Sequence, residues 1–64
     1  MRITYIIREL VYGRYYIEDS KNFSSIVFAT QYLDINAAEM VISNIFFHNL
    51  SKHVEIVKHY TSLI

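Results

Sequence analysis

The single glycine of this chain, Gly13, lies between two runs of β-forming residues and constrains the fold more than any other position. Glycine adopts positive φ angles at little cost, and tight hairpin turns require such angles. Residues 2–10 before it and 14–18 after it are rich in β-branched and aromatic side chains, which favour strands. The sequence therefore predicts that the chain begins with an antiparallel hairpin.

The residues after the hairpin predict a short third strand and a helix. Turn-forming residues at 19–22 end the second strand, and residues 24–30 are predicted as a third strand, with an extended loop as the alternative. Asp34 marks the start of a helix, because its carboxylate can accept hydrogen bonds from the free N–H groups of the first turn. Asn36 with Glu39 offers an alternative cap two residues later.

Helical spacing continues to about residue 48, and residues 53–60 return to the alternation that is typical of a strand. The order of elements is thus ββ(β)αβ, with no internal repeat or linker. This order predicts one small α+β domain over residues 1–64, in which a single helix covers one face of an antiparallel sheet of three to four strands.

The chain carries more apolar side chains than one helix on one sheet can cover. Hydrophobic residues make up 53% of the sequence, and the formal net charge is zero, so charge does not keep copies apart. The helical stripe centred on Ala38 faces the sheet, and Met40 and Phe47 lie on nearly the opposite side of the helix. On the first strand, Ile6 and Leu10 lie on the face that the helix leaves open.

This surplus predicts self-association, because large exposed apolar patches are rare in monomers. A homodimer is favoured, and the alternative is a monomer with scattered apolar surface groups. The residues expected to mediate self-association are Met40, Phe47, Ile6 and Leu10.

Tyrosine and arginine, which are common in protein-binding surfaces, are concentrated in the hairpin. We expect Tyr12, Arg14 and Tyr16 to contact an unidentified protein partner. The alternative is a small single-stranded nucleic-acid-binding or regulatory protein that uses the same tyrosines, because bases stack on aromatic rings. Glu9 and Glu18 offset the arginines of the hairpin, and this argues against phosphate binding.

The sequence lacks the patterns of an enzyme or a metal centre. It has no cysteine, and one glycine cannot form a phosphate-binding loop. His53 and His59 share a strand face but lie about 20 Å apart by strand rise, too far to share a metal ion. We therefore expect no catalytic residue, cofactor or metal ligand, and the roles of His48, His53 and His59 stay open.

The distribution of charge predicts a cytoplasmic protein with no membrane partner. The longest uncharged stretches, 22–33 and 40–51, are shorter than the roughly 20 apolar residues of a membrane-spanning helix. Arg2 and Arg8 interrupt the start of the chain where a signal peptide would need an apolar run. The absence of cysteine agrees with a reducing compartment.

Most of the chain also follows a known order of short motifs. It has a tyrosine-rich hairpin (5–7 and 13–16), a phenylalanine-x-threonine segment (28–30), a capped helix with an alanine-glutamate pair (34–39) and a closing strand (54–57). In this order the chain resembles small phage and prophage proteins. The resemblance implies an accessory protein that binds and inhibits a host protein, such as a defence enzyme, in the host cytoplasm. The scarcity of charge on the helix departs from that pattern and favours self-association over a monomer.

Overall fold

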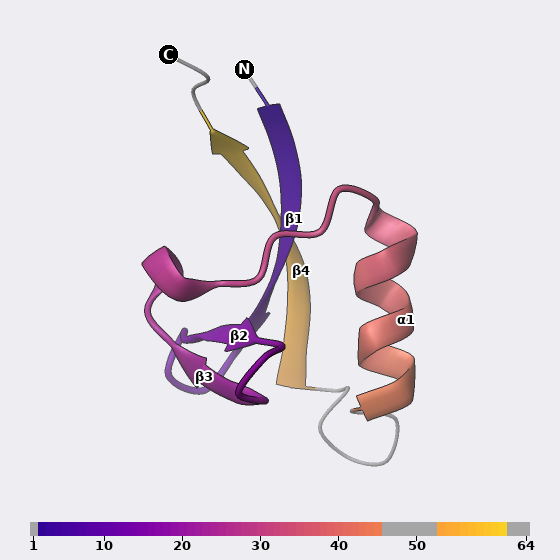
Figure 1. Ribbon diagram of the computed structural model, residues 1–64. Helices are drawn as coiled ribbons and strands as arrows, with labels where there is room; N and C mark the ends of the chain where they lie inside the picture. Colours follow the sequence, from indigo (N-terminus) through magenta and orange to yellow (C-terminus); the bar gives the residue numbers. More distant parts are fainter. Residues whose placement is uncertain (1, 46–52, 62–64) are drawn as a thin grey trace.

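The structure, a computed structural model, describes residues 2–45 and 53–61, and its elements confirm the predicted α+β class. The strands form one antiparallel sheet of order β3-β2-β1-β4, and α1 packs against β1 and β4 (Figure 1). The elements are β1 (Arg2–Glu9), β2 (Tyr15–Ile17), β3 (Asn22–Ser24), the 3₁₀ turn η1 (Ile26–Phe28), α1 (Ile35–Ile45) and β4 (Val54–Thr61).

β1 is a central strand and has neighbours on both edges. It pairs with β4 along its whole length, from Arg2↔Thr61 to Glu9↔Val54. On the other edge it meets β2 at Arg8↔Tyr15. The strands predicted at 2–10 and 53–60 are therefore both present, with ends that differ by one residue.

The predicted hairpin turn at Gly13 is confirmed. Gly13 has a φ of 74°, and the N–H of Glu9 donates a 2.8 Å hydrogen bond to the carbonyl of Arg14 across the turn. A Cβ at this position would lie 3.0 Å from Nη2 of Arg8, at the end of a flexible side chain that can move aside. The requirement for glycine at this turn therefore comes from its positive φ angle.

The third strand predicted at 24–30 is wrong for most of its length. The strand ends at Ser24, and the next residues form η1 instead. The chain then returns to β1, where Tyr32 and Tyr5 exchange two hydrogen bonds of 2.8 Å. Three consecutive apolar residues in η1 give no alternation, which explains why this run does not continue a half-buried strand.

The start of the helix is confirmed at Asp34. Oδ1 of Asp34 accepts a 3.0 Å hydrogen bond from the N–H of Asn36, and its carbonyl accepts one of 3.1 Å from Ala37. Asn36 lies inside α1, so the alternative cap is not used. The helical residues predicted beyond Ile45 lie outside the described residues.

The core lies between α1 and the sheet. Its fully buried members are Ile7, Tyr16 and Ala38. Half-buried residues pack around them from β1, β3, β4, α1 and the segment before α1: Tyr5, Phe23, Tyr32, Val41, Ile42, Val54 and Ile56. A core this small depends strongly on each member, because few other contacts replace those that one residue loses.

The opposite face of β1 is closed as well, and the expectation that Ile6 lies on an open face is wrong. Ile6 and Thr4 are each 1% exposed. The segment through η1 lies on the side of β1 away from α1 (Figure 1), and Oγ1 of Thr4 lies 3.2 Å from Oε1 of Gln31, which ends that segment. Gln31, directly after the run predicted as a strand, therefore lies beside the face of β1 that the helix does not cover.

Replacing Ile7 by alanine should lower the free energy of unfolding by about 2–5 kcal/mol, because it leaves a cavity at a fully buried position. The matched control is Ile3→Ala on the same face of β1, where the side chain is 44% exposed. That variant should lose about 1 kcal/mol. Urea denaturation followed by circular dichroism measures both, and equal losses would contradict this description of the core.

Candidate functional site

The loop between β1 and β2 presents large apolar side chains to solvent. We call residues 10–14 the hairpin tip. Leu10, Val11 and Tyr12 are 51%, 67% and 77% exposed. Three neighbouring side chains of this kind are an unusual choice for a solvated turn, where polar residues are the norm. The tip is therefore the first candidate for a binding surface.

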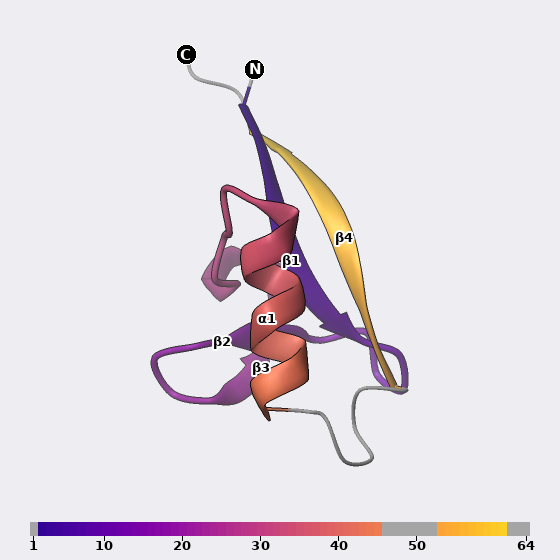
Figure 2. The same ribbon diagram turned by 90° about the vertical axis from the view of Figure 1, so that its right-hand side faces the viewer.

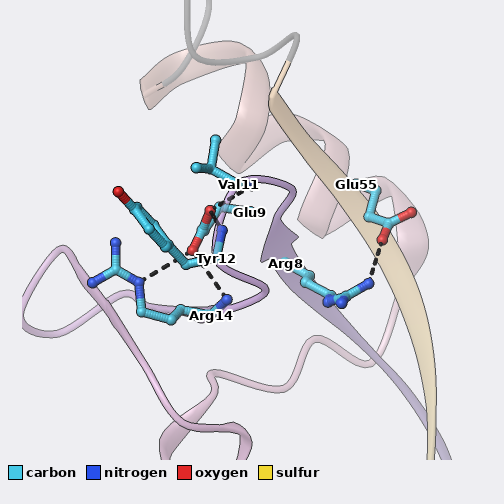
Figure 3. Close-up of polar contacts among 6 residues, drawn as sticks. All are labelled: Arg8, Glu9, Val11, Tyr12, Arg14 and Glu55. Carbon is cyan, nitrogen blue, oxygen red and sulfur yellow. Dashed lines mark hydrogen bonds and ion pairs between the residues drawn. The ribbon is translucent and has the colours of Figure 1, made fainter.

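A buried carboxylate fixes the backbone of the tip. Oε1 of Glu9 accepts hydrogen bonds from the N–H groups of Val11 (2.8 Å) and Tyr12 (2.9 Å). Its Oε2 accepts two bonds of 3.1 Å from Arg14, one from the backbone N–H and one from Nε (Figure 3). Four donors around one carboxylate hold the turn in a single conformation, since each bond constrains a different part of the loop.

These donors favour the ionised form of Glu9. The hydrogen bond from the backbone of Tyr12 is the largest influence, and together with those from Arg14 and Val11 it lowers the pKa of Glu9 from 4.5 to about 2. Burial acts in the opposite direction but is outweighed. Glu9, a residue that is 7% exposed, thus keeps a charged carboxylate inside the turn at neutral pH.

Glu9→Gln should make the stability of the fold less dependent on pH. Because the folded pKa lies below 4.5, ionised Glu9 stabilises the fold above that pH, and this stabilisation disappears as the pH falls toward 2. The amide of glutamine does not titrate and places a donor against the donors of Arg14. The variant should therefore melt below wild type at pH 7, and the difference should shrink toward pH 2.

Thermal melts between pH 7 and pH 2 test this, with Asp19→Asn in the exposed β2–β3 turn as the matched control. The control should melt close to wild type at pH 7. A melting-temperature difference between wild type and Glu9→Gln that stays constant across this range would contradict the role of the carboxylate.

Aromatic and cationic groups meet on the tip. The guanidinium carbon of Arg14 lies 4.9 Å from the ring centre of Tyr12, a cation–π contact. On the other side of the turn, Nη1 of Arg8 forms a 3.1 Å ion pair with Oε2 of Glu55 on β4 (Figure 3). Both arginines therefore have carboxylate partners, and the Arg14 side chain is still 54% exposed.

A hollow of about 270 Å³ opens beside the tip. Its walls come from the tip, from β3 and from the start of β4, and are mostly apolar: Glu9, Val11, Tyr12, Arg14, Phe23, His53 and Val54. A volume of this size holds one large side chain, and it lies at the low end of small-molecule pockets.

The structure separates the residues that were expected to bind a partner. Tyr12 and Arg14 lie together on the tip. The expectation for Tyr16 is wrong, because its side chain is 1% exposed and its ring centre lies 5.4 Å from that of Phe23. Alternation along β2 explains this, since Tyr16 points to the core side of the sheet and Tyr15 to the other.

The residues expected to mediate self-association are also separated. Leu10 belongs to the exposed tip, and Met40 is exposed on α1. The expectation for Ile6 is wrong, because a side chain that is already buried in one copy has no surface to offer a second copy. Phe47 lies outside the described residues.

The histidines and carboxylates are dispersed. Across residues 2–45 and 53–61, no group of three or more metal-binding side chains lies close enough to hold an ion. His53 lines the hollow beside the tip, and His59 pairs with Thr4 in the sheet. In the same part of the chain, no helix has the length and apolar character to cross a membrane.

The sequence did not reveal the most connected polar group, Glu9. A glutamate that follows a run of apolar strand residues is normally exposed to solvent at the end of the strand. The signal that could have identified it is its place directly before the only glycine-containing turn, where several N–H groups lack sheet partners.

Comparisons with protein-family models, curated proteins and solved structures give no match to this chain. Its functional assignment therefore depends on its own residues and their geometry.

Proposed function

We propose that this protein is a non-enzymatic, homodimeric protein-binding module and that the hairpin tip contacts its protein partner. The observation that carries the proposal is the rigid exposure of Leu10, Val11 and Tyr12 on a turn fixed by Glu9. Exposed apolar groups on a preordered loop lose little conformational entropy on binding, so more of their contact energy contributes to affinity.

The chemistry of the tip defines the kind of partner surface it fits. The apolar hollow accepts one aliphatic or aromatic side chain, in the way that protein interfaces seat anchor residues in pockets. The half-exposed side chain of Arg14 also lines this hollow, and because Glu9 offsets its charge, it contributes hydrogen-bond donors rather than net charge. The preferred partner therefore presents an apolar side chain next to a hydrogen-bond acceptor.

The same residues support protein binding over nucleic-acid binding. Arg8 and Arg14 each have a carboxylate at 3.1 Å, which offsets the positive charge that phosphate contacts depend on. Tyr16, a candidate for base stacking, is buried in the core. The tip thus offers aromatic surface with little net charge.

The resemblance to small phage and prophage proteins supports a more specific form of the proposal. In this form, the partner is a host protein that binding inhibits, and the module acts in the host cytoplasm. Inhibition then requires no chemistry from the module, because occupation of the partner's surface is sufficient.

Replacing Val11 and Tyr12 by serine should abolish capture of the partner, because it removes the two most exposed apolar side chains of the tip. The matched control is the double serine variant of Val27 and Phe28, which are similarly exposed on η1. Affinity capture from a bacterial lysate, read by mass spectrometry, compares the two variants with wild type.

A protein retained by wild type and by the η1 variant but lost from the tip variant is the expected result, with at least a tenfold decrease in yield. Equal retention by all three would contradict the assignment of the tip. Steeply salt-dependent binding of single-stranded oligonucleotides would favour the nucleic-acid alternative instead.

A further inference from the structure

The outer edge of β4 has no strand partner among the residues that the structure describes. β4 is the last strand of the sheet, and β1 is the strand that pairs with it among the described residues (Figure 2). At eight residues, β4 is long for an edge strand, and the chain contains no proline that could block it. Such an edge is a template for another strand.

The register between β1 and β4 identifies the β4 residues whose backbone N–H and C=O groups point away from β1. The N–H of Leu10 donates a 2.8 Å hydrogen bond to the carbonyl of His53. Every second residue of a strand bonds to the same neighbour, so the backbone groups of residues 55, 57 and 59 also bond to β1. Alternation then directs the backbone groups of Val54, Ile56, Lys58 and Tyr60 away from β1. The Tyr5–Tyr32 bridge agrees, because it places the backbone groups of odd-numbered β1 residues on the edge away from β4.

We propose that β4 of a second copy of this chain pairs antiparallel with this edge, with Val57 at the two-fold axis. The two sheets then join into one continuous sheet, with both copies of α1 on the same face. This inference rests on the homodimer of the proposed function and specifies where the two copies meet.

Backbone bonding favours the Val57 register over its neighbours. Directly opposite residues of two antiparallel strands point to the same face of the sheet. A two-fold axis perpendicular to the sheet therefore runs between the two copies of a single residue. With Val57 at the axis, the residues whose backbone groups point away from β1 form four hydrogen-bonded pairs between the two copies, or about eight hydrogen bonds. With Ile56 or Lys58 at the axis, the described residues provide about six.

Charge also favours the Val57 register. On one face of the sheet, it places Glu55 of each copy opposite His59 of the other, at a Cβ separation of about 5 Å, where the carboxylate can accept a hydrogen bond from the imidazole. With Lys58 at the axis, the two Lys58 ammonium groups would lie opposite each other, which is destabilising. Lys58 therefore helps to select the register.

On the helix face, the second copy reaches a hollow between α1 and β4. This hollow has a volume of about 340 Å³, and Glu39 and Ile56 are among its lining residues. In the Val57 register, Lys58 of the second copy lies opposite Ile56, which lines the same hollow as Glu39. The Val57 register thus brings a cation of one copy toward a carboxylate of the other on the helix face of the joined sheet.

A cysteine at the axis tests the register directly. Val57→Cys places two thiols at a non-hydrogen-bonded pair, where the Cα atoms lie about 4.5 Å apart and a disulfide can form. Val57 is half-buried and similar in size to cysteine, and the natural chain has no cysteine to interfere. Oxidised glutathione, which takes up the two electrons and two protons, should convert most of the variant into a covalent dimer.

The matched control is His59→Cys on the same face of β4. In the proposed register, the two copies of this residue lie about 13 Å apart along the strands, beyond the reach of a disulfide. A second variant, Lys58→Pro, removes an outward N–H without breaking a bond to β1. It should keep the circular dichroism of wild type and sediment at 7.6 kDa, half the mass of the wild-type dimer.

Cross-linking of Val57→Cys but not of His59→Cys, with a monomeric Lys58→Pro, is the expected result. A wild-type dimer whose Val57→Cys variant does not cross-link overturns the pairing of β4 and leaves self-association standing. A wild-type chain that sediments at 7.6 kDa throughout overturns the homodimer itself. If Lys58→Pro does not fold, the two cysteine variants decide the register.

Discussion

The pairing of β1 with β4 holds together the elements of this small fold. It is the only long strand pair in the described residues, and β1 also carries the contacts that place β2, Tyr32 and α1. Ile7 of the same strand packs into the core, and Glu9 at its end fixes the hairpin tip. One strand therefore connects the sheet, the core and the candidate binding surface.

This connection explains how so short a chain can present apolar side chains without disorder at the tip. The bonds to Glu9 replace the sheet partners that the turn lacks, and they do so from a buried position where the carboxylate stays ionised. Leu10, Val11 and Tyr12 are left exposed on a fixed backbone. The stability of the fold and the presentation of the tip are thus both set at the end of β1.

The parts of the fold that depend on local chemistry could be predicted from the sequence. Gly13 supplies the positive φ of the turn, and Asp34 caps α1 with its own carboxylate. The burial of Tyr16 agrees with the alternation along β2, whereas the burial of Ile6 could not be predicted, because Ile6 lies on the face of β1 opposite to that of the core residue Ile7. Apolar residues on both faces of a strand do not reveal whether a second copy or the same chain covers them.

Within residues 2–45 and 53–61, the outer edge of β4 has no partner strand, and we propose that a second copy of the chain pairs with it. Amide hydrogen exchange across a range of protein concentrations tests this pairing. The N–H groups of Ile56 and Lys58 should become protected as the concentration rises, while those of Val57 and His59 should be protected throughout. Rapid exchange of Ile56 and Lys58 at every concentration, with Val57 and His59 still protected, would contradict it.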